Sequence, residues 1–556
     1  MLTRPLERRL QFLILFCVLA ITLTVTPWIS LDPINLPKFL ILGTCGFAAI
    51  GNLVPYLRRM VNSEARMLSW AIIVFIASLI VTFLLSSSGT WAQAYGAYGR
   101  NTGLLAYVSL ALMLLSVAFV SNLSYVKKLI WALISTGIFN VIYGIVQWSG
   151  NDPINWSNPY DSILGTLGNP NFVSAHLGIA GLAAFALGVE KSRTLVTRLI
   201  LLGNVGLSLF VIYESNASQG LLIFGLGAAL VVYFRFVQQL HLLIRSGYRL
   251  LIGATSVLGV FGILNKGPLA PYLYQVSVTY RGDYWRAGWK MTTDHPIFGV
   301  GLDSYGDWYR ASRNEAAALR RGPDVTSNSA HNVFLDISSN GGFLLLIAYL
   351  LIIGLVLRSS WRVLRRTREF DAIGVGLVSA WLAYLIQSVI SINQLGLAIW
   401  GWVLGGAIIG YDLYRDRPDA PRVKVKNGRR PEQVPAAVVL TGTLGVVVGF
   451  VVSVWPMAQD IGFRNALESG DALKIEAAVK EFPRNNYYFV YAADILMENK
   501  LEDKALSLAQ QATEANPRDF NAWKMLVANP KLGESERAAA IEKMKELDPF
   551  NNTLGK

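Results

Sequence analysis

The sequence is poor in charged residues and nearly lacks cysteine. Asp, Glu, Lys and Arg make up 15% of the 556 residues, and hydrophobic residues make up 53%; a typical soluble domain has about 25% charged residues. The two cysteines, Cys17 and Cys45, lie in apolar stretches without metal-ligand spacing, which excludes a disulfide framework and a cysteine zinc site. The shortage of charge indicates an integral membrane protein.

Histidine is also scarce, so few imidazole groups are candidates for a general base. His176 lies in an apolar stretch and fits a core residue or a pathway residue equally well. His241 lies in a short basic segment and reads as a surface residue. His295 precedes a proline and is expected at a helix end, because the residue before proline disfavours helix. His331 lies where a basic, aromatic segment meets the next apolar run.

Long apolar runs occupy the chain up to about residue 457. A hydrocarbon core of roughly 30 Å needs about 20 apolar residues in a helix. The runs are continuous, whereas barrel strands alternate, so we expect an all-α polytopic membrane helix bundle. About thirteen spans are predicted, near residues 11–30, 39–57, 67–86, 104–121, 127–148, 171–189, 196–214, 218–237, 249–265, 342–358, 372–392, 395–412 and 435–457.

The net charge of +13 comes mostly from short segments between the spans. Lys and Arg in such segments set the orientation of the spans in the membrane. Because this accounts for the basic residues, nucleic acid is not an expected partner. With a cytoplasmic N-terminus, seven inside segments are basic, and the short outside loops hold only Lys38 and Arg100. This distribution agrees with the positive-inside rule, by which cytoplasmic loops carry an excess of Lys and Arg. The loop 266–330 is also basic and lies outside, but the positive-inside rule weakens for loops above roughly 60 residues. The basic linker 413–434 is then cytoplasmic, and the C-terminal tail is extracytoplasmic.

The tail, residues 458–556, has ordinary soluble composition and a weak repeat. Pro483, Pro517 and Pro549 are separated by 34 residues and then by 32. A period of about 34 with a helix-ending proline is typical of tetratricopeptide arrays, although any soluble helical hairpin is the alternative. Because such arrays bind partners, the tail could recruit another protein, and a scaffold role fits equally well.

The loop 266–330 is expected to fold, because it is rich in tyrosine and tryptophan. A loop of this length is usually functional or disordered, and its composition is not that of a disordered segment. Residues 281–291 predict a short amphipathic helix that ends before Pro296. Gly299 and Gly301 then predict a tight turn.

The loop motifs, with the glycine-closed turn before the next span, resemble the O-antigen ligase and polymerase superfamily of GT-C-type membrane glycosyltransferases. The motif residues are Arg281, Trp285, His295, Pro296, Gly299, Val300, Gly301, Leu302, His331, Asn332, Leu335 and Gly342. Segments 32–38, 98–103 and 168–171 are also similar, so that the resemblance covers roughly residues 10 to 412. A C-terminal tetratricopeptide tail is a known variation in this superfamily.

The resemblance implies transfer of a glycan from undecaprenyl diphosphate to an acceptor hydroxyl outside the cytoplasmic membrane. By position, Arg281 is the expected diphosphate ligand, with Arg286 and Arg100 as weaker candidates, since guanidinium groups bind phosphate oxygens in pairs. Such arginines can stabilise the leaving group without a metal or other cofactor. His331 is the candidate base, and Asn332 either orients it or, as we favour, caps the next helix.

One segment departs from the family pattern. Family ligases commonly carry a serine–arginine pair near residues 214–220, and Gln219 stands where that arginine is expected. Glu214 is an alternative base, although a solvated carboxylate is the favoured interpretation. Leu345 also replaces a second glycine expected after Gly342. Ligase, repeat-unit polymerase and protein O-glycosylase therefore all stay open, with a glycan, lipid or protein acceptor.

Two functions of other classes compete with glycosyl transfer. A transporter or flippase of envelope glycolipids usually shows internal repeats and ionisable or broken spans at the midplane, whereas these spans are nearly free of charge and the two halves differ. A noncatalytic envelope-assembly scaffold would leave the aromatic, arginine-rich loop without a purpose. The expected location is the bacterial cytoplasmic membrane.

Overall fold

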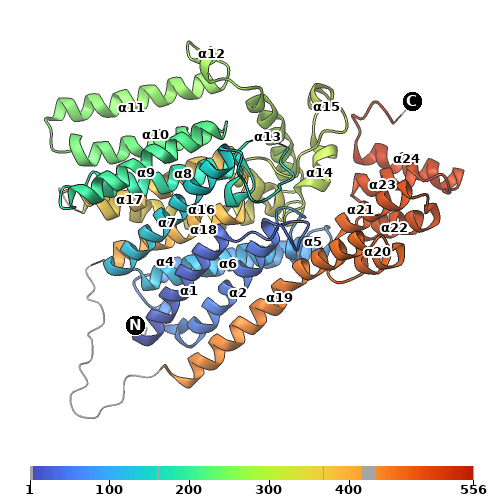
Figure 1. Ribbon diagram of the computed structural model, residues 1–556, viewed down its shortest axis with the longest axis horizontal. Coiled ribbons are helices and arrows are strands. Elements are labelled where there is room, and N and C mark those ends of the chain that lie inside the picture. The colour runs from blue at the N-terminus through green and yellow to red at the C-terminus, as the bar shows by residue number, and fades with distance from the viewer. Residues whose placement is uncertain (1–3, 160–161, 367–368, 416–433, 555–556) are drawn as a thin grey trace.

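The computed structural model describes residues 4–159, 162–366, 369–415 and 434–554. Nearly all regular structure in these ranges is helical, and none of them contains a strand. Figure 1 shows long helices running side by side, with the helices of the long loop and of the tail at one end. The fold is thus an all-α polytopic membrane helix bundle, as predicted.

Each predicted span overlaps a helix of the bundle, although α1 ends seven residues before the predicted end of the first span. These are α1 (Arg4–Leu23), α2 (Asn35–Leu53), α4 (Arg66–Leu85), α6 (Leu104–Val120), α7 (Leu123–Trp148), α8 (Pro170–Gly188), α9 (Leu195–Glu214), α10 (Gln219–Val232), α11 (Leu242–Ile263), α16 (Val333–Arg365), α17 (Ala372–Ile390), α18 (Leu395–Tyr414) and α19 (Ala436–Ser469). By length and composition, eleven helices within the described residues can cross a membrane. Of the other two, α6 is a shorter apolar helix, and α1 begins with a charged turn.

Further helices lie in the connections, and all but α13 are short. They are α3 (Leu57–Val61), α5 (Thr90–Tyr95), and, within the long loop, α12 (Ala270–Leu273), α13 (Val276–Asp294), α14 (Tyr305–Ser312) and α15 (Glu315–Arg321). The predicted loop helix is therefore confirmed and begins five residues earlier than Arg281. Most of the predicted basic linker, residues 416–433, lies outside the described residues.

The C-terminal end of α1 is held by the buried lysine Lys38. Its Nζ donates to the carbonyl oxygens of Ile21, Thr22 and Thr24, at 2.8, 3.3 and 2.9 Å. The last carbonyl groups of a helix lack intrahelical partners and favour a nearby cation. Lys38, one of the two basic residues predicted in short outside loops, therefore fixes the connection between α1 and α2.

The tail consists of α20 (Ala472–Val479), α21 (Asn486–Glu498), α22 (Glu502–Ala515), α23 (Phe520–Ala528) and α24 (Glu534–Leu547). Each repeat proline lies just beyond a helix, because α20, α22 and α24 end shortly before Pro483, Pro517 and Pro549. Consecutive helices pack around a core of their own. The assignment to the tetratricopeptide family stays a prediction.

The tail is joined to the bundle without a break and docks onto the long loop. Helix α19 continues through Pro456 well past the predicted end of its span. The fully buried carboxylate of Asp548 accepts hydrogen bonds from Arg310 at 2.8 Å and from Arg313 at 2.7 Å. The carboxylate of Asp460 accepts from the backbone amide of Leu31 at 2.6 Å. The tail and the long loop therefore lie at the same end of the bundle.

Candidate active site in the long loop

The turn at residues 296–301 is bonded to a break in α16. The amides of Val300 and Gly301 donate to the carbonyls of Ser339 and Asn340, at 2.8 and 3.0 Å, and the amide of Phe343 donates to Pro296 at 2.8 Å. At the break, Gly342 adopts φ 66° and ψ −171°, a region that only glycine occupies readily. The proline and glycine motifs thus fix the end of α13 against the start of α16.

Replacing Gly342 with alanine is expected to destabilise the protein by about 1–3 kcal/mol, the usual cost of a strained backbone conformation. An added Cβ would also lie 2.3 Å from the carbonyl oxygen of Ile297. Gly354→Ala on the same helix is the matched control, since a Cβ there meets nothing within 4 Å, and alanine favours helix by up to about 1 kcal/mol. Thermal unfolding in nanodiscs gives the melting temperature of each variant. Equal melting temperatures for the two variants would contradict this interpretation.

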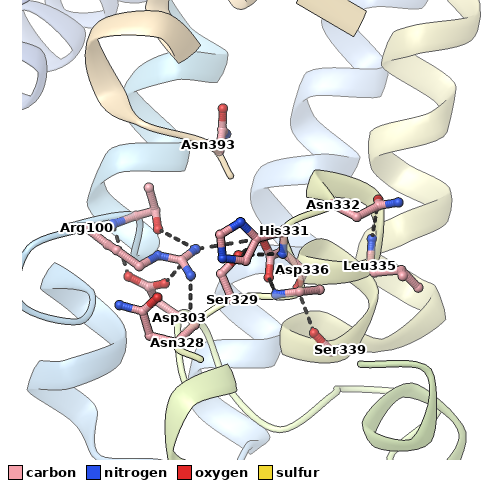
Figure 2. Close-up of polar contacts among 12 residues, drawn as sticks. Arg100, Asp303, Asn328, Ser329, His331, Asn332, Leu335, Asp336, Ser339 and Asn393 are labelled. Atoms are coloured by element: carbon pink, nitrogen blue, oxygen red, sulfur yellow. Dashed lines mark hydrogen bonds and ion pairs between the residues drawn. The ribbon is translucent and has the colours of Figure 1, made fainter. Parts of the chain in front are cut away.

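His331 lies in a tight turn directly before α16, as Figure 2 shows. The Ser329 hydroxyl accepts from the backbone amide of His331 at 2.9 Å and donates to Asp336 at 2.8 Å. Asp336 also accepts from the amide of Ala330 at 2.7 Å. Asn332 caps the helix, because its side chain accepts from the amides of Phe334 and Leu335. Asn332 therefore has the favoured capping role, and the turn holds His331 at φ 51°.

The imidazole of His331 is mostly buried and surrounded by positive charge. Its ring stacks on Tyr284, with 5.3 Å between centroids. Burial, together with the charges of Arg281, Arg100 and Arg321, lowers the pKa of His331 to about 4. The ring has no hydrogen-bond partner in the part of the chain that the structure describes. At neutral pH the imidazole is thus uncharged and can accept a proton.

Arg281 lies in the first half of α13 and acts on His331 electrostatically. Its side chain is partly buried, and burial lowers the pKa of its guanidinium. No carboxylate within the described ranges pairs with it. Because a buried charge normally has a partner, Arg281 is positioned to receive an anion.

The two weaker arginine candidates already have partners. Arg100 is buried and pairs with Asp303 at 3.3 Å and with Asp336 at 3.9 Å. It also donates to the backbone carbonyl of Asn328, so it joins the loop before α6 to the long loop (Figure 2). Arg286 pairs with Asp283, and its side chain is 58% exposed. Both guanidinium groups therefore balance carboxylates, unlike that of Arg281.

Sequence reasoning missed Arg321, at the end of α15. Its guanidinium donates to the hydroxyl of Tyr284 and lies 4.3 Å from the ring centroid of Tyr280. Its charge also contributes to the low pKa of His331. The general basicity of the long loop was the only signal for this residue, since it lies 40 positions beyond Arg281.

Glu214 and Gln219 lie at the connection between α9 and α10. Glu214 accepts a hydrogen bond from the indole of Trp148 at 2.9 Å. Gln219 is buried and donates to the backbone carbonyl of Asn171. No contact among the described residues joins either side chain to His331. The structure thus brings Arg281, Arg100 and His331 together. Glu214 and Gln219 lie apart from them.

The other histidines occupy positions that fit structural roles. His295 caps the C-terminus of α13 and packs against Trp308, as predicted for a helix-end residue. His241 caps the N-terminus of α11. His176 is fully buried in α8. Across the described ranges, no three His, Cys, Asp or Glu side chains are grouped to hold a metal ion.

The described structure is a polytopic membrane helix bundle whose folded loop carries Arg281, without a carboxylate partner among the described residues, and the uncharged imidazole of His331. A family model described as O-antigen ligase matches residues 174–350. The match supports the resemblance to the O-antigen ligase superfamily and a membrane glycosyltransferase-like function. The matched region includes Arg281 and His331. A search of curated proteins finds no match to the chain.

Proposed function

We propose that the protein transfers a glycan from a polyprenyl diphosphate carrier, undecaprenyl diphosphate in bacteria, to an acceptor hydroxyl. The observation that carries the proposal is the uncharged imidazole of His331 beside the unpaired guanidinium of Arg281. A base and an anion-binding group are the two components that such a transfer needs. The acceptor is a glycan, a lipid or a protein hydroxyl.

The reaction is a direct displacement at the anomeric carbon. His331 takes the proton of the acceptor hydroxyl, whose oxygen forms a bond to that carbon. The bond from the anomeric carbon to the diphosphate oxygen breaks, and its electron pair leaves with the diphosphate. Arg281 stabilises the negative charge on that group, so the step proceeds with inversion and without a metal ion.

The proposed topology places the site outside the cytoplasmic membrane, with the N-terminus in the cytoplasm. Residues 1–457 then form the transmembrane glycosyltransferase domain and residues 458–556 an extracytoplasmic helical domain. The contact of Asp548 with Arg310 and Arg313 supports a common side for the tail and the loop. The polyprenyl chain is accommodated among membrane lipids and apolar helices.

Replacing Arg281 with glutamine is expected to lower transfer about 10²- to 10³-fold, the effect of losing one preorganised charge-stabilising group. Arg286→Gln on the same helix is the matched control. Its exposed ion pair is worth at most about 1 kcal/mol, so transfer should fall by less than about fivefold. The assay uses purified protein in nanodiscs, a polyprenyl-diphosphate-linked glycan and a panel of acceptors. Equal rates for the two variants would exclude Arg281 as the diphosphate ligand.

The pH dependence of transfer is expected to reflect the lowered pKa of His331. The neutral base predominates above a pKa of about 4, so kcat/KM should rise with pH through about 4 and stay level to neutrality. By linkage, the stability that neutral His331 contributes is present above the unfolded pKa near 6.5 and is lost as pH falls towards 4. A rate profile from pH 3.5 to 8 tests this. An acid limb centred near 6.5 would contradict the assignment.

A further inference from the structure

A cavity of about 690 Å³ lies between the tail and the loops of the bundle. Its walls come from α5 and the segment after it, from residues 303–328 of the long loop, and from α21, α23 and the ends of α22 and α24. Asp303 and Asn328 belong to this wall and also bind Arg100. The cavity therefore adjoins the structure that positions His331.

The cavity combines aromatic faces with unsatisfied polar atoms. Tyr98 and Tyr487 stack at 3.9 Å between centroids, and the side chain of Tyr487 is 41% exposed. Asn101 is 1% exposed, and its side-chain oxygen has no hydrogen-bond partner among the residues that the structure describes. The side-chain oxygen of Asn486 is also buried without a partner in the same ranges. Buried polar atoms normally have partners, so this wall suits a ligand that donates hydrogen bonds.

The charges on the cavity wall cancel. The charged lining residues are Asp303, Asp307 and Asp519 with Arg310, Arg484 and Arg518. Arg310 already binds Asp548, and Arg518 lies over the ring of Trp308. Asp303, Asp307 and Asp519 on the same wall disfavour a phosphate-rich ligand, because their carboxylates repel its negative charge. Hydroxyl groups and apolar sugar faces fit its amides and tyrosines.

We propose that this cavity binds a neutral oligosaccharide segment of the acceptor, an inference that rests on the proposed transferase function. Arg281, the proposed diphosphate ligand, does not line the cavity, whereas the partners of Arg100 do. A saccharide held there adjoins the contacts of Arg100, whose charge acts on His331, and this proximity fits a segment of the acceptor. The tail is then part of the acceptor site and selects the acceptor.

The test uses thiol protection in the full chain, reconstituted in nanodiscs. Cys17 and Cys45 are buried, so an introduced cysteine is the accessible thiol. Asn521→Cys lies on the cavity wall. The matched control is Ser507→Cys, at an exposed residue of α22 that does not line the cavity. The probes are neutral glucan, galactan and mannan hexasaccharides and, separately, inorganic pyrophosphate. Maleimide labelling rates are measured with each probe.

At least one hexasaccharide is expected to slow labelling of Asn521→Cys about tenfold at ten times its Kd, and to leave Ser507→Cys unchanged. In the Asn521→Cys background, Tyr487→Ala should remove this protection, whereas Tyr272→Ala, at a residue that is 84% exposed outside the cavity, should retain it. Protection by pyrophosphate alone, by no hexasaccharide, or equally in both cysteine variants would overturn the proposal.

This readout requires neither donor nor turnover. Absent protection in a protein that still transfers glycan would overturn the acceptor site and leave the transferase function intact. Specific protection in a protein that transfers nothing would support saccharide binding and count against the transferase.

Discussion

Replacing His331 with alanine is expected to lower glycan transfer about 10²- to 10⁴-fold, the usual contribution of a positioned general base. The imidazole is neutral at pH 7 because burial and neighbouring arginines lower its pKa to about 4. Its ring contacts Tyr284 and donates no structural hydrogen bond among the described contacts. The variant should therefore fold and bind the lipid-linked donor while losing turnover. Single-turnover transfer by the purified variant in nanodiscs measures the effect.

His295→Ala is the control for this prediction. It removes the other imidazole of the long loop, which packs against Trp308 at the end of α13. Its transfer rate should stay close to that of the wild type. Wild-type transfer by His331→Ala would exclude a catalytic role for this histidine, and Glu214 would then be the base to examine.

Replacing Asp548 with alanine is expected to weaken docking of the tail by about 3–5 kcal/mol, because breaking a buried ion pair leaves an uncompensated buried charge. Asp548 is completely buried and lies between Arg310 and Arg313. Neither arginine pairs with another carboxylate within the described ranges. Amide hydrogen exchange of residues 305–325 and 534–554 measures the effect, and both segments should exchange about 10²-fold faster or more.

The control for the tail is Asp503→Ala, at an aspartate whose side chain is 85% exposed. An exposed ion pair contributes at most about 1 kcal/mol, so exchange should change little. Unchanged exchange in Asp548→Ala would mean that the tail is held by other contacts, such as that between Asp460 and Leu31.

The spans were predictable because burial in lipid requires long apolar runs, which composition alone reveals. Hydropathy locates the part of a helix that lies in the membrane, but it does not show where the helix ends. The predicted span 435–457 therefore did not include the last turns of α19. That helix continues past Pro456 because Gln459, Asp460 and Phe463 pack inside the protein. Its later turns are polar on one side and were assigned to the tail.

The local parts of the site were also predictable. The capping role of Asn332 and the helix end at His295 depend on residues within a few positions. The pairing of Arg100 with Asp303 spans about 200 residues, and no periodicity or spacing connects them. Arg321 was missed for the same reason, because tertiary packing alone brings it to Tyr284.

The most direct test of glycosyl transfer follows both products in proteoliposomes that contain the wild-type protein, a polyprenyl-diphosphate-linked glycan and a hydroxyl-bearing acceptor. The free polyprenyl diphosphate and the glycosylated acceptor are quantified in the same reaction. We predict that they form in equal amounts, with acceptor consumed only on the side where the long loop lies. Movement of the intact lipid-linked glycan across the bilayer, without a new glycosidic bond, would contradict this function and indicate a transporter.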